Sequence, residues 1–541
     1  MAPATPRLRD FFDRSTHALG VLNDVGLLSP RFAVSMARGI FEAGPSSAAS
    51  VIVGDHYRGE ETSIIDDAGT TSFAGLRSRC LSIAHGLRAA GVGPGHNVAI
   101  LTRNHRGFAE AAAATAFVGA DALFLNTGFA GPQLEDVLTR EGAGTLIYDE
   151  EFSEIADRGA AKLQRFLSWT DGNPAFPTLD DLVRENAPTR LQKPAKVGRA
   201  TLLTSGTTGT PKGANRSSNS SDFDGMVGFF ERMPFRVGET MLLCAPTFHA
   251  WGLVNFVMGS LFANTLVMHR RFDPERVLQA IQKHRVDSMA VVPVMLSRIL
   301  ALEPSVIQKY DTSSLHRVGC SGSALPGELA LRWMNTFGDN LYNMYGSTEV
   351  SVTTIAVPAE LRAAPGTAGR PPLGTTVRIY DDDDKPVSDG TTGRIFVGNN
   401  QQFEGYTGGG GKKMIDGLMS IGDVGHFDKD GLLFVEGRDD DMIVSGGENV
   451  FPAEVEDLLS DHPAVLEAAV IGVEDEAFGQ RLRAFVVRKP DHDLTDVEVK
   501  AFVKDHLARH KVPRDVDFLD EIPRNSTGKI LKRVLREITP G

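Results

Sequence analysis

The chain has 541 residues, which is too long for one hydrophobic core and predicts two or three domains. Its 42% hydrophobic and 23% charged residues are ordinary for a globular protein, and a formal net charge of −13 excludes a general nucleic-acid binder. Three widely separated cysteines exclude a disulfide framework and zinc-ligand spacing. With neither a membrane-spanning apolar run nor a secretory signal, the sequence predicts a cytoplasmic protein.

Residues 1–50 predict one or two amphipathic helices in a separate N-terminal extension. Apolar side chains recur at roughly helical spacing over residues 8–28, and a second apolar run covers residues 32–41. Residues 1–41 hold five arginines and three aspartates, so this extension is mildly basic within an acidic chain. We expect the helices to pack on the main body, with peripheral contact to a membrane or a lipid substrate as the alternative.

Residues 51–200 alternate between helical and strand patterns. Residues 72–90 and the alanine-rich residues 106–118 have the pattern of helices, whereas residues 97–101 and 122–125 have that of short buried strands. This alternation predicts a parallel or mixed sheet that is covered by helices.

A loop rich in glycine and hydroxyl groups follows the apolar residues 200–203. It has the sequence Thr-Ser-Gly-Thr-Thr-Gly over residues 204–209 and is closed by Pro211, Lys212 and Gly213. Glycine lets successive backbone N–H groups point into one concavity, hydroxyls add donors and lysine adds a positive charge. The spacing differs from that of the common strand–GxxxxGK[ST]–helix loop. The loop alone therefore predicts a polyphosphate site or a flexible surface loop equally.

Several apolar strands after this loop end in polar or glycine-bearing segments. The strands and the segments that follow them are 241–245 with 246–252, 317–320 with 321–326, and 341–344 with 345–349. Ligands bind at the carboxyl edge of open α/β sheets, so these segments are candidates for a ligand site.

The rest of the chain changes character twice. Residues 370–437 hold short apolar strands separated by Gly, Asp and Thr, which predicts a small β-rich subdomain. Residues 438–541 alternate between helix and strand patterns and end in a predicted helix at residues 529–538. The expected fold is α/β: a large N-terminal domain of helix-covered sheets over residues 51–437, followed by a small mobile α+β domain.

Five motifs in this order resemble the AMP-forming acyl-CoA synthetases, which include fatty-acid and aryl-acid CoA ligases. The resemblance covers nearly all of the chain after about residue 55 and favours the bacterial medium- and long-chain fatty-acid ligases. It implies two steps, in which a carboxylate and ATP give acyl-AMP and pyrophosphate, and coenzyme A then displaces AMP. It also implies Mg²⁺ as the metal. The motifs are residues 204–213, 246–252, 345–349, 420–431 with 437–456, and 523–533.

The resemblance assigns nucleotide-binding roles to several side chains. Tyr345 would stack on adenine, Asp423 would accept from the ribose hydroxyls and Arg438 would reach the ribose or a phosphate. Thr348 would contact the α-phosphate, and Glu349 would bind Mg²⁺. The β- and γ-phosphates would be held by Thr204, Ser205, Gly206, Thr207, Thr208 and Gly209, with Lys212 nearby, while the backbone of Gly322, Ser323 and Ala324 would line the adenine site.

The resemblance also assigns the reacting groups. Lys529 would bridge the acyl carboxylate and the α-phosphate, and His249 would orient the carboxylate or shape the tunnel mouth, with Trp251 as a gate. Asp440 matches the position of the family's hinge, about which the small domain would rotate. The segment presented for the second step would be Ser445, Gly446, Gly447 and Glu448, which would let the pantetheine arm pass.

The acid pocket is expected beside the helix that follows His249. Its segments are apolar, and no acidic side chain stands near residue 249 to pair with an ammonium group, which disfavours amino acids. We expect a medium- or long-chain fatty acid, with an aryl or small branched acid as the alternative. Transfer to a carrier protein and a catalytically inactive lipid-binding relative are further alternatives, the latter disfavoured by the intact Lys212, Glu349, Asp423, Arg438 and Lys529.

Overall fold

A computed structural model of the chain describes residues 16–204, 212–215, 223–403, 405–406, 411–445, 448–475, 479–490, 492–525 and 528–539. The chain divides into two units, residues 1–319 with 403–411 and residues 320–402 with 412–541. The predicted domain boundary and hinge near Asp440 lie within the second unit and stay predictions. None of the described helices is long and apolar enough to cross a bilayer.

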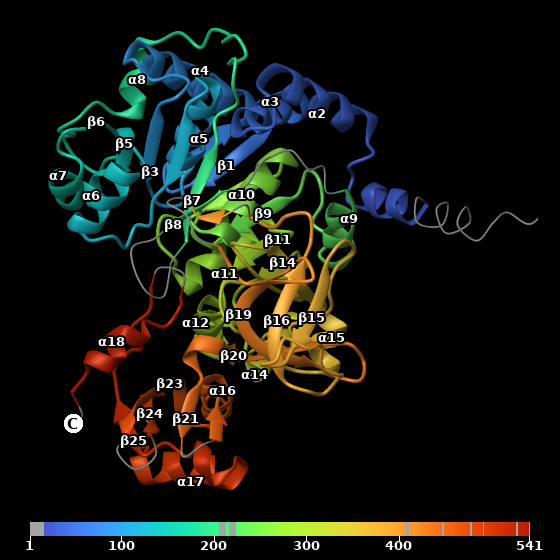
Figure 1. Ribbon diagram of the computed structural model, residues 1–541. Coiled ribbons are helices and arrows are strands. Elements are labelled where there is room, and N and C mark those ends of the chain that lie inside the picture. Colours follow the sequence, from blue (N-terminus) through green and yellow to red (C-terminus); the bar gives the residue numbers. More distant parts are fainter. Residues whose placement is uncertain are drawn as a thin grey trace, which may run out of the picture. The chain divides into compact units, whose positions relative to one another are not determined.

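The first unit holds a mixed sheet in the strand order β17-β8-β7-β4-β3-β5-β6 (Figure 1). Strands β3 to β7 are parallel, as the alternating pattern predicts, and β8 and β17 extend the sheet with antiparallel pairing. Helices α4, α5 and α8 pack together beside it, and side chains of α6 and α7 form a buried cluster with β3, β4 and β5. The elements are α4 Phe73–Ala89, β3 Asn97–Leu101, α5 Arg106–Phe117, β4 Asp121–Phe124, α6 Gly131–Arg140, β5 Ala143–Asp149, α7 Ser153–Gly159, β6 Gln164–Trp169, α8 Leu179–Glu185, β7 Ala200–Thr204, β8 Lys212–Asn215 and β17 Gly405–Tyr406.

A second sheet of this unit runs in the order β12-β11-β9-β10-β1-β2. Strands β11, β9, β10 and β1 are parallel, and β2 forms an antiparallel hairpin with β1. Strands β10 and β11 lie on either side of β9, and all four residues of each are buried. This burial explains why their sequences do not alternate between apolar and polar residues. The elements are β1 Thr62–Asp66, β2 Gly69–Ser72, α9 Phe223–Arg232, β9 Thr240–Leu243, α10 Ala250–Leu261, β10 Thr265–Met268, α11 Pro274–His284, β11 Ser288–Val291, α12 Pro293–Leu300, α13 Pro304–Ile307 and β12 Arg317–Cys320.

Two helices of the N-terminal segment, α2 (Pro30–Ala43) and α3 (Ser47–Arg58), pack against each other and join the first unit. The buried ring of Phe32 meets Tyr57 and Phe262 edge-on, which ties α2 to α3 and to the end of α10. On the outer face, Phe41 remains 78% exposed. The expected packing on the main body is therefore observed for α2 and α3, residues 1–15 lie outside the described residues, and contact with a membrane stays a prediction.

The second unit contains the hairpin of β13 and β14 and two further sheets. One sheet has the order β15-β16-β19-β18 with β20 beside β19, and the other has the order β22-β21-β24-β23 with β25 beside β24. The first matches the predicted β-rich subdomain, and the second, with α16, α17 and α18, matches the predicted α+β segment. Its elements are α14 Gly327–Phe337, β13 Leu341–Ser347, β14 Ser351–Ala356, α15 Pro358–Ala363, β15 Thr376–Tyr380, β16 Gly393–Gly398, β18 Met414–Ile415, β19 Leu418–Phe427, β20 Leu433–Arg438, β21 Ile443–Ser445, β22 Glu448–Val450, α16 Pro452–Ser460, β23 Val465–Asp475, β24 Gly479–Arg488, α17 Asp496–His506, β25 Asp515–Phe518 and α18 Lys532–Glu537.

Candidate active site

The predicted phosphate loop joins two paired strands of the first unit. Strand β7 ends at Thr204 and β8 begins at Lys212, and these two residues face each other in the antiparallel ladder. The pairing brings both ends of the loop together at the carboxyl edge of the parallel sheet, where ligands bind in such folds. The predicted phosphate ligands Ser205, Gly206, Thr207, Thr208 and Gly209 lie outside the described residues.

The segment that carries Thr348 and Glu349 is a tightly held hairpin turn between β13 and β14. A Cβ at Gly346 would lie 1.9 Å from the carbonyl oxygen of Ser351, so only glycine fits there. Ser351 itself has a φ of +64°, a conformation that is costly for a residue with a side chain. The Glu349 N–H donates to Ser347 Oγ at 3.2 Å. This backbone places Thr348 and Glu349 in fixed positions at the end of the strand.

Three of the predicted nucleotide-binding residues meet in the second unit. Tyr345 Oη donates to Asp423 Oδ2 at 2.5 Å, and Arg438 Nη1 lies 3.3 Å from Asp423 Oδ1. Burial, reinforced by the adjacent Asp423 carboxylate, raises the pKa of Tyr345 well above its ordinary value, so the phenol stays protonated and remains a donor. The Asp423 side chain is 15% exposed, so a ligand can reach part of this carboxylate, and a carboxylate is a natural acceptor for a diol.

Strand register and one glycine create this cluster. Asp423 on β19 pairs directly with Arg438 on β20. Directly before Asp423, Gly422 has a φ of +79°, and a Cβ there would lie 3.1 Å from Arg438 Nη2. The absent side chain lets the guanidinium lie over the strand, where it also donates to Ile421 O at 3.4 Å. The predicted adenine-lining residues Gly322, Ser323 and Ala324 follow the end of β12, and Gly322 adopts a φ of +99°.

His249 precedes α10 in the first unit and is placed by close backbone packing. A Cβ at Gly252 would lie 2.0 Å from Pro246 O, so glycine lets the first turn of α10 lie against the segment before it. The centroid of the His249 ring lies 4.6 Å from that of Phe248, with the two rings tilted by 48°, and burial lowers the pKa of His249 to about 4. The imidazole is consequently neutral at pH 7, so it can donate one hydrogen bond and accept another but carries no positive charge.

Trp251 is fixed in the core behind this segment. Its indole N–H donates to Val291 O at 3.0 Å, and the residue is only 6% exposed. A Cβ at Gly319 would lie 2.9 Å from the indole ring, so the missing side chain of Gly319 makes room for it. The hydrogen bond to Val291 and the close packing of Gly319 fix the orientation of the indole ring. The expected gating role of Trp251 stays a prediction.

Lys529 lies in a turn before the last helix, which corrects the expectation that this helix begins at Lys529. Helix α18 begins at Lys532. The Lys529 N–H donates to Asn525 Oδ1 at 2.9 Å, the Asn525 N–H donates to Lys529 O at 2.9 Å, and Gly528 has a φ of +80°. These bonds close a tight turn that helical dihedrals cannot provide. Lys529 is thus presented by a loop, and the nearby Lys532 pairs with Asp441 at 3.4 Å.

The segment predicted for the second step forms a hairpin in which Ser445 on β21 faces Glu448 on β22. Gly446 and Gly447 between them lie outside the described residues, as does the side chain of the predicted hinge residue Asp440. The hinge position falls on a short 3₁₀ turn, Asp439–Asp441, directly after β20.

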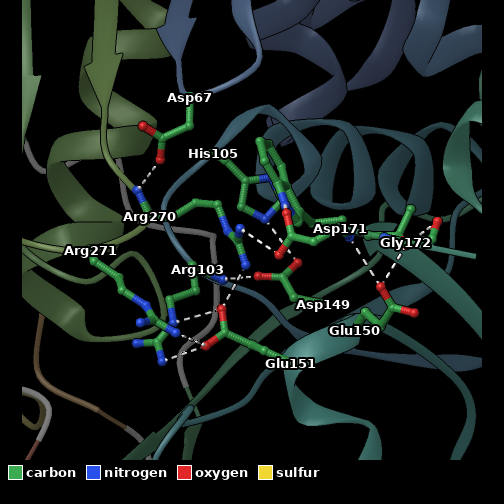
Figure 2. Close-up of polar contacts among 12 residues, drawn as sticks. Asp67, Arg103, His105, Asp149, Glu150, Glu151, Asp171, Gly172, Arg270 and Arg271 are labelled. Atoms are coloured by element: carbon green, nitrogen blue, oxygen red, sulfur yellow. Dashed lines mark hydrogen bonds and ion pairs between the residues drawn. The ribbon is translucent and has the colours of Figure 1, made fainter. Parts of the chain in front are cut away.

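The sequence reasoning missed a buried polar cluster at the carboxyl edge of the first sheet (Figure 2). The Asp149 carboxylate, fully buried, accepts from His105 Nε2 at 2.9 Å, Ser168 Oγ at 2.6 Å and the Arg103 N–H at 2.8 Å. Nearby, Glu151 contacts Arg103, Arg270 and Arg271, and together these arginines outweigh burial and lower its pKa to about 2. The available signal was the polar run directly after the predicted strand at residues 97–101.

The donor set around Glu349 suits Mg²⁺ that is shared with a phosphate ligand. Nowhere in the described parts of the chain do three His, Cys, Asp or Glu side chains gather as metal ligands. Mg²⁺ is commonly held by one or two carboxylates together with substrate phosphates and water. A single, partly buried carboxylate at the end of β13 fits that arrangement.

Comparison with known proteins decides the family. Residues 54–407 match the AMP-binding enzymes, and residues 454–529 match the AMP-binding enzyme C-terminal domain. The chain belongs to the AMP-binding enzymes. The predicted adenylate-forming fold and the assignment to AMP-forming ligases are therefore confirmed.

Three curated relatives illustrate the range of the family. The chain is 34% identical to a feruloyl-CoA synthase of Amycolatopsis sp. over 477 residues, which is 86% of this chain and 93% of the relative. It is 30% identical to the fatty acid–[acyl-carrier-protein] ligase ScoC of Streptomyces coeruleorubidus over 512 residues, 89% of this chain and 94% of the relative. It is 32% identical to an indoleacetate–CoA ligase of Aromatoleum aromaticum over 482 residues, 87% of this chain and 93% of the relative.

A solved structure agrees with this assignment. The o-succinylbenzoate CoA synthetase MenE from Bacillus subtilis, in complex with its acyl-adenylate intermediate, superposes with a TM-score of 0.78 at 27% identity, covering 91% of this chain and 98% of that one. Two of the three curated relatives act on aromatic acids by name. The predicted preference for a fatty acid is therefore not confirmed, and the alternative of an aryl acid has better support.

Proposed function

We propose that this protein activates an aromatic carboxylic acid with ATP and transfers the acyl group to coenzyme A. The observation that carries the proposal is the 34% identity to a feruloyl-CoA synthase across 86% of the chain. The aromatic side chains before and within α10 are consistent with it. Phe248 and the fixed indole of Trp251 are flat apolar surfaces of the kind on which an aryl ring packs favourably.

The residues of the second unit would bind the nucleotide. Asp423 would accept from the ribose hydroxyls, with Tyr345 and Arg438 holding its carboxylate in place. Thr348 would contact the α-phosphate, and Glu349 would contribute a ligand to Mg²⁺, which supplies charge neutralisation to the phosphates when bound. The backbone constraints at Gly346 and Ser351 would hold both residues in place before ATP arrives.

The first chemical step joins two anions. An oxygen of the acid attacks the α-phosphorus, the new C–O–P linkage forms, and pyrophosphate leaves with the electrons of the broken P–O bond. Because burial keeps His249 neutral at pH 7, its role would be to orient the carboxylate by hydrogen bonding. The positive charge that stabilises the transition state would come from Lys529. In the second step the coenzyme A sulfur attacks the acyl carbon and AMP leaves.

The test is pyrophosphate release by the purified protein with ATP and Mg²⁺ across ferulate, indoleacetate, decanoate and palmitate, followed by chromatography of the products with coenzyme A. The proposal expects kcat/KM for at least one aryl acid to exceed that for palmitate by about 10-fold or more. It also expects AMP and aryl-CoA in equal amounts. A higher kcat/KM for palmitate would restore the fatty-acid prediction and contradict the proposal.

A second candidate differs only in the acceptor of the acyl group. The 30% identity to ScoC, a fatty acid–[acyl-carrier-protein] ligase, favours it. In that case the same incubation would accumulate acyl-AMP in the presence of coenzyme A, and a phosphopantetheinylated carrier protein would consume it.

A further inference from the structure

The side-chain amide of Asn104 links two segments that are far apart in the sequence. Asn104 follows β3, is 6% exposed and donates from Nδ2 to Leu243 O at 3.1 Å and to Ala245 O at 2.9 Å. Its Oδ1 accepts from the Thr247 N–H at 2.9 Å and from Thr247 Oγ1 at 3.1 Å. A primary amide offers two donor hydrogens and two acceptor sites, so all four are used.

These four bonds hold the segment that leads to His249. Leu243 is the last residue of β9, and Thr247 precedes His249 by two residues. The other side of the segment is held by Ala290 O, which accepts from the N–H groups of Cys244 and Ala245 at 3.1 and 3.0 Å. Asn104 therefore supplies the side-chain contacts that bind Thr247, at the point where the chain leaves the sheet and turns toward α10.

Asn104 is itself held rigidly by its two neighbours in the chain (Figure 2 shows both). The Arg103 N–H and His105 Nε2 both bond to the buried carboxylate of Asp149, which Ser168 also contacts. On the other ring nitrogen, His105 Nδ1 accepts from the Gly107 N–H at 3.0 Å. Those two bonds place the imidazole proton on Nε2 and leave the ring one orientation.

We propose that Asn104 is a positioning residue for binding of the acid: it sets the 244–249 segment so that Phe248 and His249 face the substrate. The inference rests on the proposed function in taking His249 as a contact of the acid. Misplacing a substrate-orienting group by about 1 Å can lower a rate by about 100-fold. Neither Ala nor Asp can replace the amide, because Ala leaves buried carbonyls and an N–H without partners, and Asp has no hydrogen to donate.

The kinetic test compares Asn104→Ala with Thr265→Val. Thr265 Oγ1 donates to Thr62 O at 2.7 Å at the start of β10, so this control also removes a side-chain hydrogen bond from the first unit but leaves the 244–249 segment alone. We expect Asn104→Ala to raise KM for the acid by about 10-fold or more and to change KM for ATP less than about 2-fold. Thr265→Val should change neither constant. An unchanged KM for the acid in Asn104→Ala, or an equal rise in Thr265→Val, would overturn the proposal.

A double mutant separates positioning from general damage. If Asn104 acts through His249, adding Asn104→Ala to His249→Ala should raise KM for the acid less than about 2-fold further. Full multiplication of the two single effects would show that Asn104 acts elsewhere and would contradict the proposal.

Hydrogen exchange gives a readout that needs no substrate. The Thr247 amide is bonded to Asn104 Oδ1, so its exchange should accelerate by about 10-fold or more in Asn104→Ala and stay unchanged in Thr265→Val. Unaltered protection of Thr247 in Asn104→Ala would overturn the inference whatever acid the enzyme uses. A wild-type enzyme that activates no aryl acid would instead contradict the proposed function, while the exchange result still decides whether Asn104 holds this segment.

Discussion

Two carboxylates, one in each unit, differ in burial, and the difference indicates which one stabilises the fold and which one can bind a ligand. Asp149 is fully buried and accepts from three donors of the protein. Asp423 is 15% exposed, bonds to Tyr345 and pairs loosely with Arg438. The first carboxylate is closed off from solvent, whereas part of the second is exposed where a ligand can reach it. The comparison predicts a loss of stability when Asp149 is changed and a loss of nucleotide affinity when Asp423 is changed.

The largest effect is expected from Asp149→Ala. Three donors would lose their buried partner at about 1 kcal/mol or more each, so the free energy of unfolding should fall by about 3 kcal/mol or more. Denaturant unfolding measures it, and Asp171→Ala is the control because the Asp171 carboxylate is 74% exposed and should cost less than about 1 kcal/mol. Equal losses in the two variants would break the contrast between buried and exposed carboxylates.

The next largest effect is expected at Lys529, whose assigned role is in the chemical step, unlike the roles of the two carboxylates. Lys529→Ala should lower the rate of adenylation by about 100- to 1,000-fold, as expected for the loss of one charge that stabilises a transition state. Transfer from preformed acyl-AMP to coenzyme A should persist, because that step needs no new positive charge at the α-phosphate. Lys532→Ala removes a neighbouring ammonium that already pairs with Asp441 and should retain activity. Undiminished pyrophosphate release in Lys529→Ala would contradict the assigned role.

The pH dependence of the free energy of unfolding tests whether His249 is buried as a neutral ring in the first unit. Burial lowers the pKa of His249 from 6.5 to about 4, so between these values the unfolded chain binds a proton that the folded chain does not. The contribution is present above about pH 6.5 and is lost as the pH falls toward 4, by about 3 kcal/mol in total. Wild type should therefore lose more stability than His249→Gln over that interval in denaturant titrations. Parallel curves would show that the ring is solvated.

The smallest effect is expected from Asp423→Ala. Removing this acceptor leaves one buried donor, the Tyr345 hydroxyl, without its partner, so the free energy of unfolding should fall by about 1 kcal/mol, while KM for ATP should rise by about 10-fold through the lost ribose contact. Tyr345→Phe, which keeps the ring and removes the hydroxyl, should raise KM for ATP less than Asp423→Ala does. If Asp423→Ala lowered stability as much as Asp149→Ala while KM for ATP stayed constant, the two carboxylates would have the same role.

Much of the architecture followed from local pattern. The strands at residues 97–101 and 317–320 are predicted with the observed bounds, because short apolar runs between turn residues leave few alternatives. The start of the last helix was misplaced by three residues, since the turn at Lys529 depends on the side chain of Asn525 and on the left-handed Gly528. The preference for a fatty acid is not confirmed, because helix spacing and apolar content do not distinguish an alkyl from an aryl pocket.

The sequence by itself determined the helix-covered parallel sheets, the placement of motifs at strand ends and the membership of an adenylating family, because periodicity and motif order are local properties of the chain. Only the tertiary structure decided which distant polar groups meet. Tyr345 and Asp423 are 78 positions apart, and Asn104 lies 143 positions before Thr247. Bonds over such separations depend on strand order and on glycines that admit close backbone approach, which no local pattern encodes.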